Sequence, residues 1–206
     1  MRWPNSRSYP STDLHGLQRH ALRLGGIDIK IADHVSPSLS WKTVTLLIRN
    51  FGQSDSEHVD ALALRAFAQF KNAYDDWPAF QAKIAHVSLL ADGGEMIVAE
   101  LEGNIAGAVA YIGPGKPKAA FFRPEWPIMR MLVVDPADRG LGIGRALVDE
   151  CLRRAMRDGA TAFALHTSEI MEVALPMYQR MGFQRIASAP PIHGVAYGVY
   201  LKELHG

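Results

Sequence analysis

The sequence has a single cysteine, almost no net charge and no long apolar run. Cys151 has no partner in the same chain, so an internal disulfide framework is excluded and a reducing compartment is expected. The formal net charge of +1 gives no argument for binding nucleic acid or an anionic membrane. No stretch approaches the roughly 20 apolar residues of a membrane span, and the first residues lack the apolar segment of a secretory signal. These absences predict a cytoplasmic protein that binds neither nucleic acid nor membrane.

The length and composition are those of one globular domain preceded by an extension. The 206 residues are 48% hydrophobic and 21% charged, which is enough for a sizeable core in a water-soluble fold. Residues 1–42 differ from the rest, because Pro4, Pro10, Pro37 and six serines punctuate them, and the periodic patterns at 14–22 and 27–31 are short. We therefore expect a weakly ordered extension over residues 1–42 and the domain over residues 43–206.

A stretch in the middle of the domain has the pattern of a phosphate-binding loop. Residues 131–134 are continuously apolar and predict a buried strand, which Asp135-Pro136 ends because proline has no N–H for the ladder. Gly140, Gly142 and Gly144 follow, and their backbone N–H groups are not covered by side chains. A helix is predicted immediately afterwards, so its free N–H groups and positive dipole end would face the loop. This arrangement is typical of a phosphate or pyrophosphate site.

Two common phosphate loops do not fit this stretch. A Walker A loop ends in Gly-Lys-Ser/Thr, which is absent. A Rossmann G-x-G-x-x-G pattern counted from Gly142 would need glycine where the chain has Leu147. The acidic residue expected about 20 positions further on is also missing, since that region holds Phe163 and Ala164. Nucleotide binding of either kind is therefore not indicated.

Two other motifs fit a known family. Residues 139–144 read Arg-Gly-Leu-Gly-Ile-Gly after an apolar strand that ends in Val-Asp-Pro, and this resembles the acetyl-CoA-binding motif of the GNAT N-acetyltransferase superfamily. Residues 174–183 read Ala-Leu-Pro-Met-Tyr-Gln-Arg-Met-Gly-Phe, which is similar to the family's A-x-x-x-Y-x-x-x-G-F. The resemblance covers Thr43 to about Leu204.

The expected elements have the order β-α-α-β-β-β-α-β-α-β, which matches the GNAT fold. That fold is of the α/β (α+β) class, with a central mixed β-sheet whose parallel strands splay apart, flanked by about four helices. Pro176 lies inside the last expected helix and should kink it. The expected elements are a strand at 43–49, helices at about 56–70 and 75–90, strands at 95–101, 105–112 and 131–134, a helix at 143–158, a strand at 160–167, a helix at 168–180 and a strand at 195–201.

The resemblance implies acetyl-CoA as cosubstrate and no metal. In the family, the pantetheine arm lies between the splayed strands, and the glycine loop surrounds the pyrophosphate. Backbone groups of the central strand would meet the pantetheine amides, and one N–H there could polarise the thioester carbonyl. The implied cofactor-binding residues are Leu132, Val133, Val134, Arg139, Gly140, Leu141, Gly142, Ile143, Gly144 and Arg145.

The resemblance also makes Tyr178 the candidate acid that protonates the departing thiolate. The general base is left open between two residues. Glu125 is the carboxylate nearest to the position where many relatives have a glutamate, but it is equally consistent with a solvated loop residue. His166 ends a strand beside the expected cleft and has a suitable ordinary pKa, although a structural role explains it as well. Cys151 falls on the apolar face of its helix, so it is interpreted as a core residue and direct transfer is preferred to an acyl-enzyme.

The acceptor is not identified by the sequence beyond an amine of a small molecule or peptide. By resemblance, residues 67–77, 121–126 and 190–197 should surround it. The oligomeric state is left open, including a homodimer. The alternative to an acetyltransferase is an acyl-CoA-binding sensor or regulatory domain without catalysis, which loss of the tyrosine at position 178 would have favoured.

Overall fold

The computed structural model describes residues 23–24, 27–28 and 45–204. The expected extension over residues 1–42 therefore lies almost wholly outside the described residues. Its described part is the antiparallel pair of β1 (Arg23–Leu24) and β2 (Ile27–Asp28). Within the described part of the chain, no helix is long and apolar enough to cross a membrane.

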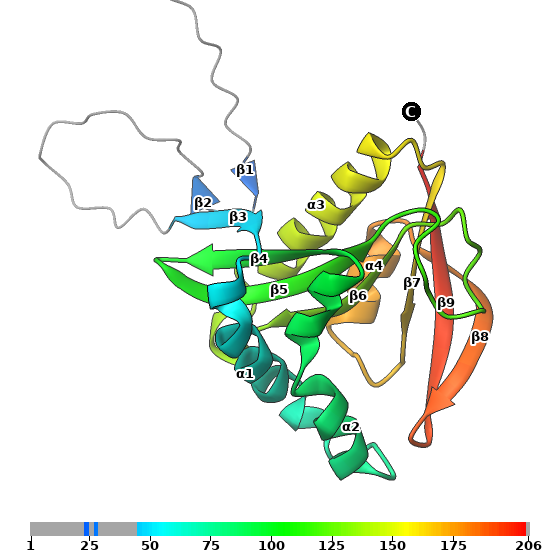
Figure 1. Ribbon diagram of the computed structural model, residues 1–206, viewed down its shortest axis with the longest axis horizontal. Helices are drawn as coiled ribbons and strands as arrows, with labels where there is room; N and C mark the ends of the chain where they lie inside the picture. Colours follow the sequence, from blue (N-terminus) through cyan, green and yellow to red (C-terminus); the bar gives the residue numbers. More distant parts are fainter. Residues whose placement is uncertain (1–22, 25–26, 29–44, 205–206) are drawn as a thin grey trace, which may run out of the picture.

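A seven-stranded mixed sheet forms the centre of the domain, in the order β3-β4-β5-β6-β7-β9-β8 (Figure 1). All neighbouring strands are antiparallel except β6 and β7, which are parallel. The predicted mixed sheet is confirmed. The strands are β3 (Leu46–Asn50), β4 (Glu95–Leu101), β5 (Asn104–Ile112), β6 (Ile128–Val134), β7 (Ala162–Thr167), β8 (Gln184–Ile192) and β9 (Val195–Glu203).

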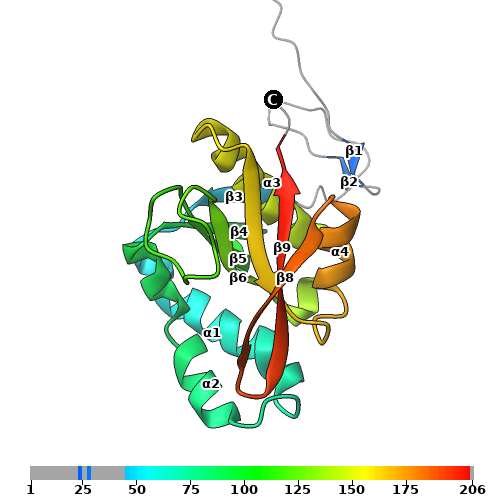
Figure 2. The same cartoon turned by 90° about the vertical axis from the view of Figure 1, so that its right-hand side faces the viewer.

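Helices cover both faces of the sheet, as Figures 1 and 2 show from two directions. α1 (Ser56–Phe67) and α2 (Trp77–Ile84) pack on one face, and α3 (Ile143–Arg157) and α4 (Ala174–Arg180) pack on the other. Successive side chains of a strand point to opposite faces of the sheet, so the hydrophobic core has two parts. Val98 of β4 packs in the part under α1 and α2, and its neighbour Ile97 packs in the part under α3 and α4. Short 3-10 turns connect the elements: η1 (Gln53–Asp55), η2 (Ala68–Phe70), η3 (Val87–Asp92) and η4 (Pro136–Asp138).

Three local predictions are corrected by the structure. The second helix ends at Ile84 rather than near residue 90, and η3 replaces its last turns. The last helix begins at Ala174 rather than at residue 168, which places Pro176 in the first turn. There the missing N–H would have had no intrahelical acceptor, so the predicted kink is wrong. Strand β8 was not predicted, because its side chains are mostly exposed and it contains Pro190-Pro191.

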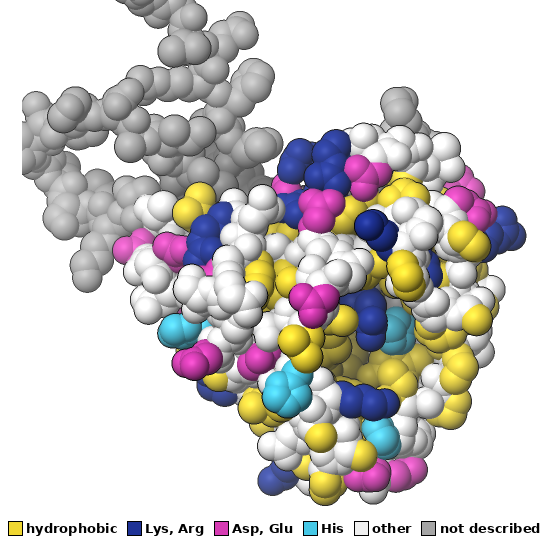
Figure 3. Space-filling view, in the orientation of Figure 1, with side chains coloured by type: hydrophobic (Ala, Val, Ile, Leu, Met, Phe, Trp, Pro, Cys, Tyr) yellow, Lys and Arg dark blue, Asp and Glu magenta, His cyan; other side chains and the backbone are white. Residues whose placement is uncertain are grey.

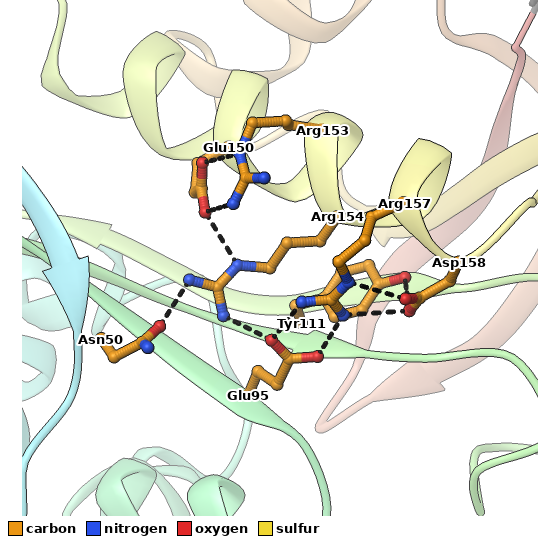
Figure 4. A network of polar contacts seen from close by, with 8 residues as sticks. All are labelled: Asn50, Glu95, Tyr111, Glu150, Arg153, Arg154, Arg157 and Asp158. Carbon is orange, nitrogen blue, oxygen red and sulfur yellow. Dashed lines mark hydrogen bonds and ion pairs between the residues drawn. The ribbon is translucent and has the colours of Figure 1, made fainter.

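A buried arginine fixes α3 over the sheet (Figure 4). Arg154 is 4% exposed, and its guanidinium donates to Glu150, Glu95 and Asn50 at 2.9, 2.7 and 2.7 Å. These acceptors come from α3 itself, from β4 and from the end of β3. A buried charge is tolerated only when it is paired and its hydrogen bonds are satisfied, and this one is. The network therefore ties α3 to β4 and to the end of β3.

Candidate active site

The parallel strands β6 and β7 diverge and open a cleft at their carboxyl ends. They pair only at Ile128 and Ala164. The cleft has a volume of about 300 Å³ and extends from α4 to the wall formed by α1, α2 and η3. Figure 3 shows a hollow on this face with a mostly hydrophobic floor and with histidine and basic side chains around it. Residues from the two strands that line it are Met129, Arg130, Met131, Leu132, Leu165, His166 and Thr167.

A bulge in β6 lies at the point where the strands separate. Ala108 of β5 pairs with Val133 and Ala110 pairs with Arg130, so two residues of β6 lie opposite one of β5. Met131 has a φ of 53°, a left-handed conformation that is strained for a residue with a side chain. A bulge leaves ladder groups unpaired and re-aims the backbone. Leu132 lines the cleft here, whereas Val133 is buried in the sheet.

The glycine loop ends at an open helix terminus. Gly140 and Gly142 have φ values of 84° and 79°, which glycine adopts without strain. Gly142 is the N-cap of α3, and no side chain caps that end or adds a negative charge in its first turn. A Cβ at either glycine would meet no atom within 4 Å, so the space beside the backbone is open. Free N–H groups, a positive dipole end and open space together fit a pyrophosphate.

Arg139 directs its side chain away from this loop. Its guanidinium donates to the Oε1 atom of Gln69 at 3.0 Å and to the carbonyl oxygen of Ala66 at 3.2 Å. It therefore ties the loop to the carboxyl end of α1. If Arg139 contributes to cofactor binding, it does so through its backbone groups.

The remaining residues of the predicted cofactor motif differ in burial. Ile143 is 1% exposed and belongs to the core, whereas Leu141 is 40% exposed. Gly144 packs beside Val134, which would meet a Cβ there at an ordinary contact distance of 3.6 Å. Arg145 lies on the outer face of α3 and pairs with Asp149 at 3.5 Å. The loop thus presents backbone rather than side chains to a ligand.

Tyr178 lies in the wall of the cleft on α4 and is 5% exposed. Burial raises the pKa of its phenol above the ordinary value, so it stays protonated at neutral pH. The side chain thus brings a protonated hydroxyl to the cleft, which is the donor that the expected acid role requires. Cys151, in contrast, is fully buried in the core under α3, as predicted, and burial raises the pKa of its thiol.

His166 lines the same cleft on β7. Its ring lies against Phe121, Phe122 and Tyr197, with centroid distances of 5.6, 5.9 and 5.5 Å. Burial, together with the nearby charge of Arg130, lowers the pKa of His166 to about 4, so the imidazole is neutral at pH 7. Its Nδ1 atom is buried and has no hydrogen-bond partner among the described residues.

Glu125 lies outside the cleft. It is on the loop between β5 and β6, its side chain is 65% exposed, and its carboxylate is 4.0 Å from the guanidinium of Arg123. The structure therefore brings His166 and Tyr178 to one cleft but not Glu125. No group of three or more His, Cys, Asp or Glu side chains in the described ranges is arranged to hold a metal ion.

A family model described as the acetyltransferase (GNAT) family matches residues 57–183. The chain belongs to the GNAT acetyltransferase family. Among curated proteins, it is 36% identical to N-acetyltransferase family 8 member 2 of Rattus norvegicus over 107 residues, covering 51% of this chain and 46% of that one. It is 30% identical to probable N-acetyltransferase family 8 member 5 of Mus musculus over 118 residues, covering 57% and 51%. The chain thus spans about half the length of these curated relatives.

Solved GNAT structures share the fold. A GNAT-family acetyltransferase of Staphylococcus aureus superposes with a TM-score of 0.62 at 21% identity, covering 78% of this chain and all of the other. The yncA protein of Salmonella typhimurium, solved with its cofactor acetyl-CoA, superposes with a TM-score of 0.56 at 18% identity, covering 78% and 94%. The family assignment from residues 139–144 and 174–183 is confirmed.

Sequence reasoning missed a charged residue on the central strand of the cleft. Arg130 is the basic residue within β6, and it lines the cleft next to His166. The sequence did contain a signal for Arg130, namely a charged residue inside an otherwise apolar central strand. Burying a charge is costly, so such a residue indicates a functional or structural role. The bulge at Met131 had no signal in the sequence, because a positive φ is not expected of methionine.

Proposed function

We propose that the protein transfers the acetyl group of acetyl-CoA directly to the nitrogen of an amine. The observation that carries the proposal is the opening between β6 and β7, because the cleft there contains both Tyr178 and His166. The family and the acetyl-CoA of the solved neighbour support the choice of cofactor.

The cofactor would be held mainly by backbone groups. The N–H groups of residues 140–144 and the end of α3 suit the pyrophosphate. The pantetheine amides would pair with groups that the bulge at Met131 and Leu132 releases from the β5 ladder. We therefore propose residues 132–134 and 139–145 as the cofactor-binding residues. The side chains of Arg139 and Arg145 would not contact the cofactor, because they pair with Gln69 and Asp149.

In the transfer step, a bond forms between the amine nitrogen and the acetyl carbon, and the carbon–sulfur bond breaks. Neutral His166 accepts a hydrogen bond from the attacking amine. Its pKa of about 4 makes it too weak to keep that proton at pH 7, so the proton passes on to solvent. Tyr178 donates a hydrogen bond to the departing thiolate. We place the base role at His166 rather than at Glu125, because Glu125 is exposed and outside the cleft.

Thermal unfolding and acetyl-CoA consumption test this proposal. A ligand that binds only the folded state raises the melting temperature. Acetyl-CoA should raise it, whereas NAD and ATP should not. Addition of an amine panel should then release free CoA above the hydrolysis background. A shift with NAD or ATP alone would refute the cofactor assignment. Binding without transfer to any amine would favour the alternative, a catalytically silent sensor.

A further inference from the structure

An arginine and a histidine lie at matching positions across the opening between β6 and β7. Ile128 pairs with Ala164, so Arg130 and His166 each lie two residues beyond the pair. Side chains two residues apart on a strand point to the same face. Both residues line the cleft, and the charge of Arg130 is close enough to act on His166. A cation and a neutral imidazole thus stand side by side.

Arg130 has no counter-charge in the part of the chain that the structure describes. It forms no hydrogen bond or ion pair there, although other arginines such as Arg49, Arg65 and Arg154 do. Its side chain is open to the cleft, yet surrounding protein lowers its pKa. No Asp or Glu lines the cleft among the described residues, whereas Lys83 adds a second cation. The cleft therefore lacks an anion.

Apolar side chains form part of the cleft wall. Phe67, Phe80 and Ile84 contribute to it from α1 and α2. The ring of Phe80 stacks on Tyr74 with centroids 4.0 Å apart and meets Phe67 edge-on at 5.5 Å. This packed aromatic surface favours a hydrophobic side chain of the acceptor.

We propose that the acceptor is a free α-amino acid with an apolar side chain, bound by its carboxylate to Arg130. This inference rests on the proposed acetyl transfer. An α-amino acid has its carboxylate and its amine on one carbon, which matches an anion site adjacent to His166. The guanidinium suits a carboxylate because it can donate two parallel hydrogen bonds. The side chain would lie against the wall of Phe67, Phe80 and Ile84.

The same charges disfavour other amines. An acceptor without a carboxylate, such as a polyamine or a lysine side chain, would bring an unpaired ammonium towards Arg130 and Lys83. Like charges in a low-dielectric cleft repel, and no acidic side chain of the described residues lines the cleft to compensate them. A zwitterion carries its own compensating charge.

The test compares acceptors that differ only in the carboxylate, with the full chain at saturating acetyl-CoA. L-Phenylalanine and L-leucine should be acetylated. Phenylalaninamide, phenethylamine and Nα-acetyl-lysine amide, none of which has a carboxylate, should have kcat/KM values lower by about 100-fold or more, as is typical when a built polar site loses its partner. Preference for phenethylamine or the lysine derivative would overturn the amino-acid assignment and leave acetyl transfer standing.

Variants assign the effect to Arg130. Arg130→Gln should lower kcat/KM for phenylalanine by about 100-fold, chiefly through KM, and should change the value for phenylalaninamide by less than about threefold. Arg130→Lys should restore part of the loss, because it keeps the charge without the two-pronged geometry. Arg123→Gln, at an exposed arginine outside the cleft, is the matched control and should behave as wild type.

Calorimetry separates failure of the inference from failure of the proposed function. All variants should keep wild-type affinity for acetyl-CoA, and N-acetyl-L-phenylalanine should bind wild type but not Arg130→Gln. Equal losses for phenylalanine and its amide in Arg130→Gln would refute carboxylate binding. Loss of acetyl-CoA binding in the wild-type chain would instead refute the proposed function itself.

Discussion

The hydroxyl groups of Tyr74 and Tyr197 lie 2.7 Å apart in the interior and join two elements that are distant in sequence. Tyr74 lies between α1 and α2, whereas Tyr197 lies on β9 and lines the cleft beside His166. Burial raises the pKa of both phenols, so both stay protonated and one donates to the other. This bond holds the segment between α1 and α2 against the sheet.

Removing one of these hydroxyl groups should cost stability, because the other is left buried and unpaired. We expect Tyr74→Phe to lower the free energy of unfolding by about 1–3 kcal/mol. The double variant Tyr74→Phe/Tyr197→Phe should lose less than the sum of the two single changes. Denaturant unfolding of all four proteins measures this cycle. Additive losses would show that the two hydroxyl groups do not depend on each other.

Gly142→Val should weaken acetyl-CoA binding by more than its effect on the fold explains. A β-branched residue at a φ of 79° is strained, by roughly 1–2 kcal/mol for the left-handed conformation. Its side chain would also fill the open space beside the α3 terminus. Gly103→Val is the matched control, since Gly103 has a φ of 83° and equally open space but lies in the β4–β5 turn. Calorimetry should show weaker acetyl-CoA binding only for Gly142→Val. Equal affinities in both variants would place the pyrophosphate elsewhere.

Tyr178→Phe should lower the single-turnover rate by about 100-fold, the usual contribution of a positioned acid. The ring remains, so stability and acetyl-CoA affinity should be nearly unchanged. Because burial raises the pKa of Tyr178, the wild-type rate should not fall through its ionisation below about pH 10. Tyr200→Phe is the control, a 4% exposed tyrosine on β9 that does not line the cleft. Wild-type rapid-quench rates in Tyr178→Phe would reduce Tyr178 to a packing residue.

His166 should make the protein less stable in mild acid. Its folded pKa of about 4 lies below the ordinary 6.5, so the unfolded state binds more protons between these values. The stabilisation is complete above about pH 6.5 and is lost as the pH falls towards 4.

Comparison with His166→Gln isolates this contribution. Between pH 7 and pH 5, the wild-type free energy of unfolding should fall by up to about 2 kcal/mol more than that of the variant. Urea unfolding at both pH values measures the difference. Identical pH dependence in the two proteins would show that His166 titrates normally in the folded state.

Local signals explain which parts of the fold could be predicted. The strand, loop and helix around Gly142 could be predicted, because their signals are local. An apolar run, a proline and three glycines lie within a few residues of one another, directly before the amphipathic pattern of the helix. The start of α4 at Ala174 was not predictable, because Ser168 is a better N-cap by sequence than Val173, which is the N-cap in the structure. Strand β8 also depends on tertiary context, because its pairing with β9 rather than its own pattern makes it a strand.

The site residues likewise divide into those that a local motif predicts and those that only the fold brings together. Tyr178 belongs to a motif and could be assigned a role from the sequence, whereas Arg130 and His166 are not part of any motif. Their proximity depends on the register of two strands that are separated by the whole of α3. The interaction of Arg139 with Gln69 likewise spans 70 residues. Side-chain direction in such long-range contacts is not encoded in any local spacing.

The single pairing between Ile128 and Ala164 has a consequence for the integrity of the sheet itself. Beyond it, β6 and β7 each expose an unpaired edge in the interior of the molecule. Pantetheine in that opening would supply amide groups to both edges, as an added strand does in β-augmentation. The sheet of the free protein is thus joined between β3–β6 and β7–β9 by a single backbone pair, and side-chain packing on its two faces holds the halves together. Acetyl-CoA would take the place of a strand between β6 and β7, so that the sheet is continuous along this opening only while the cosubstrate is bound.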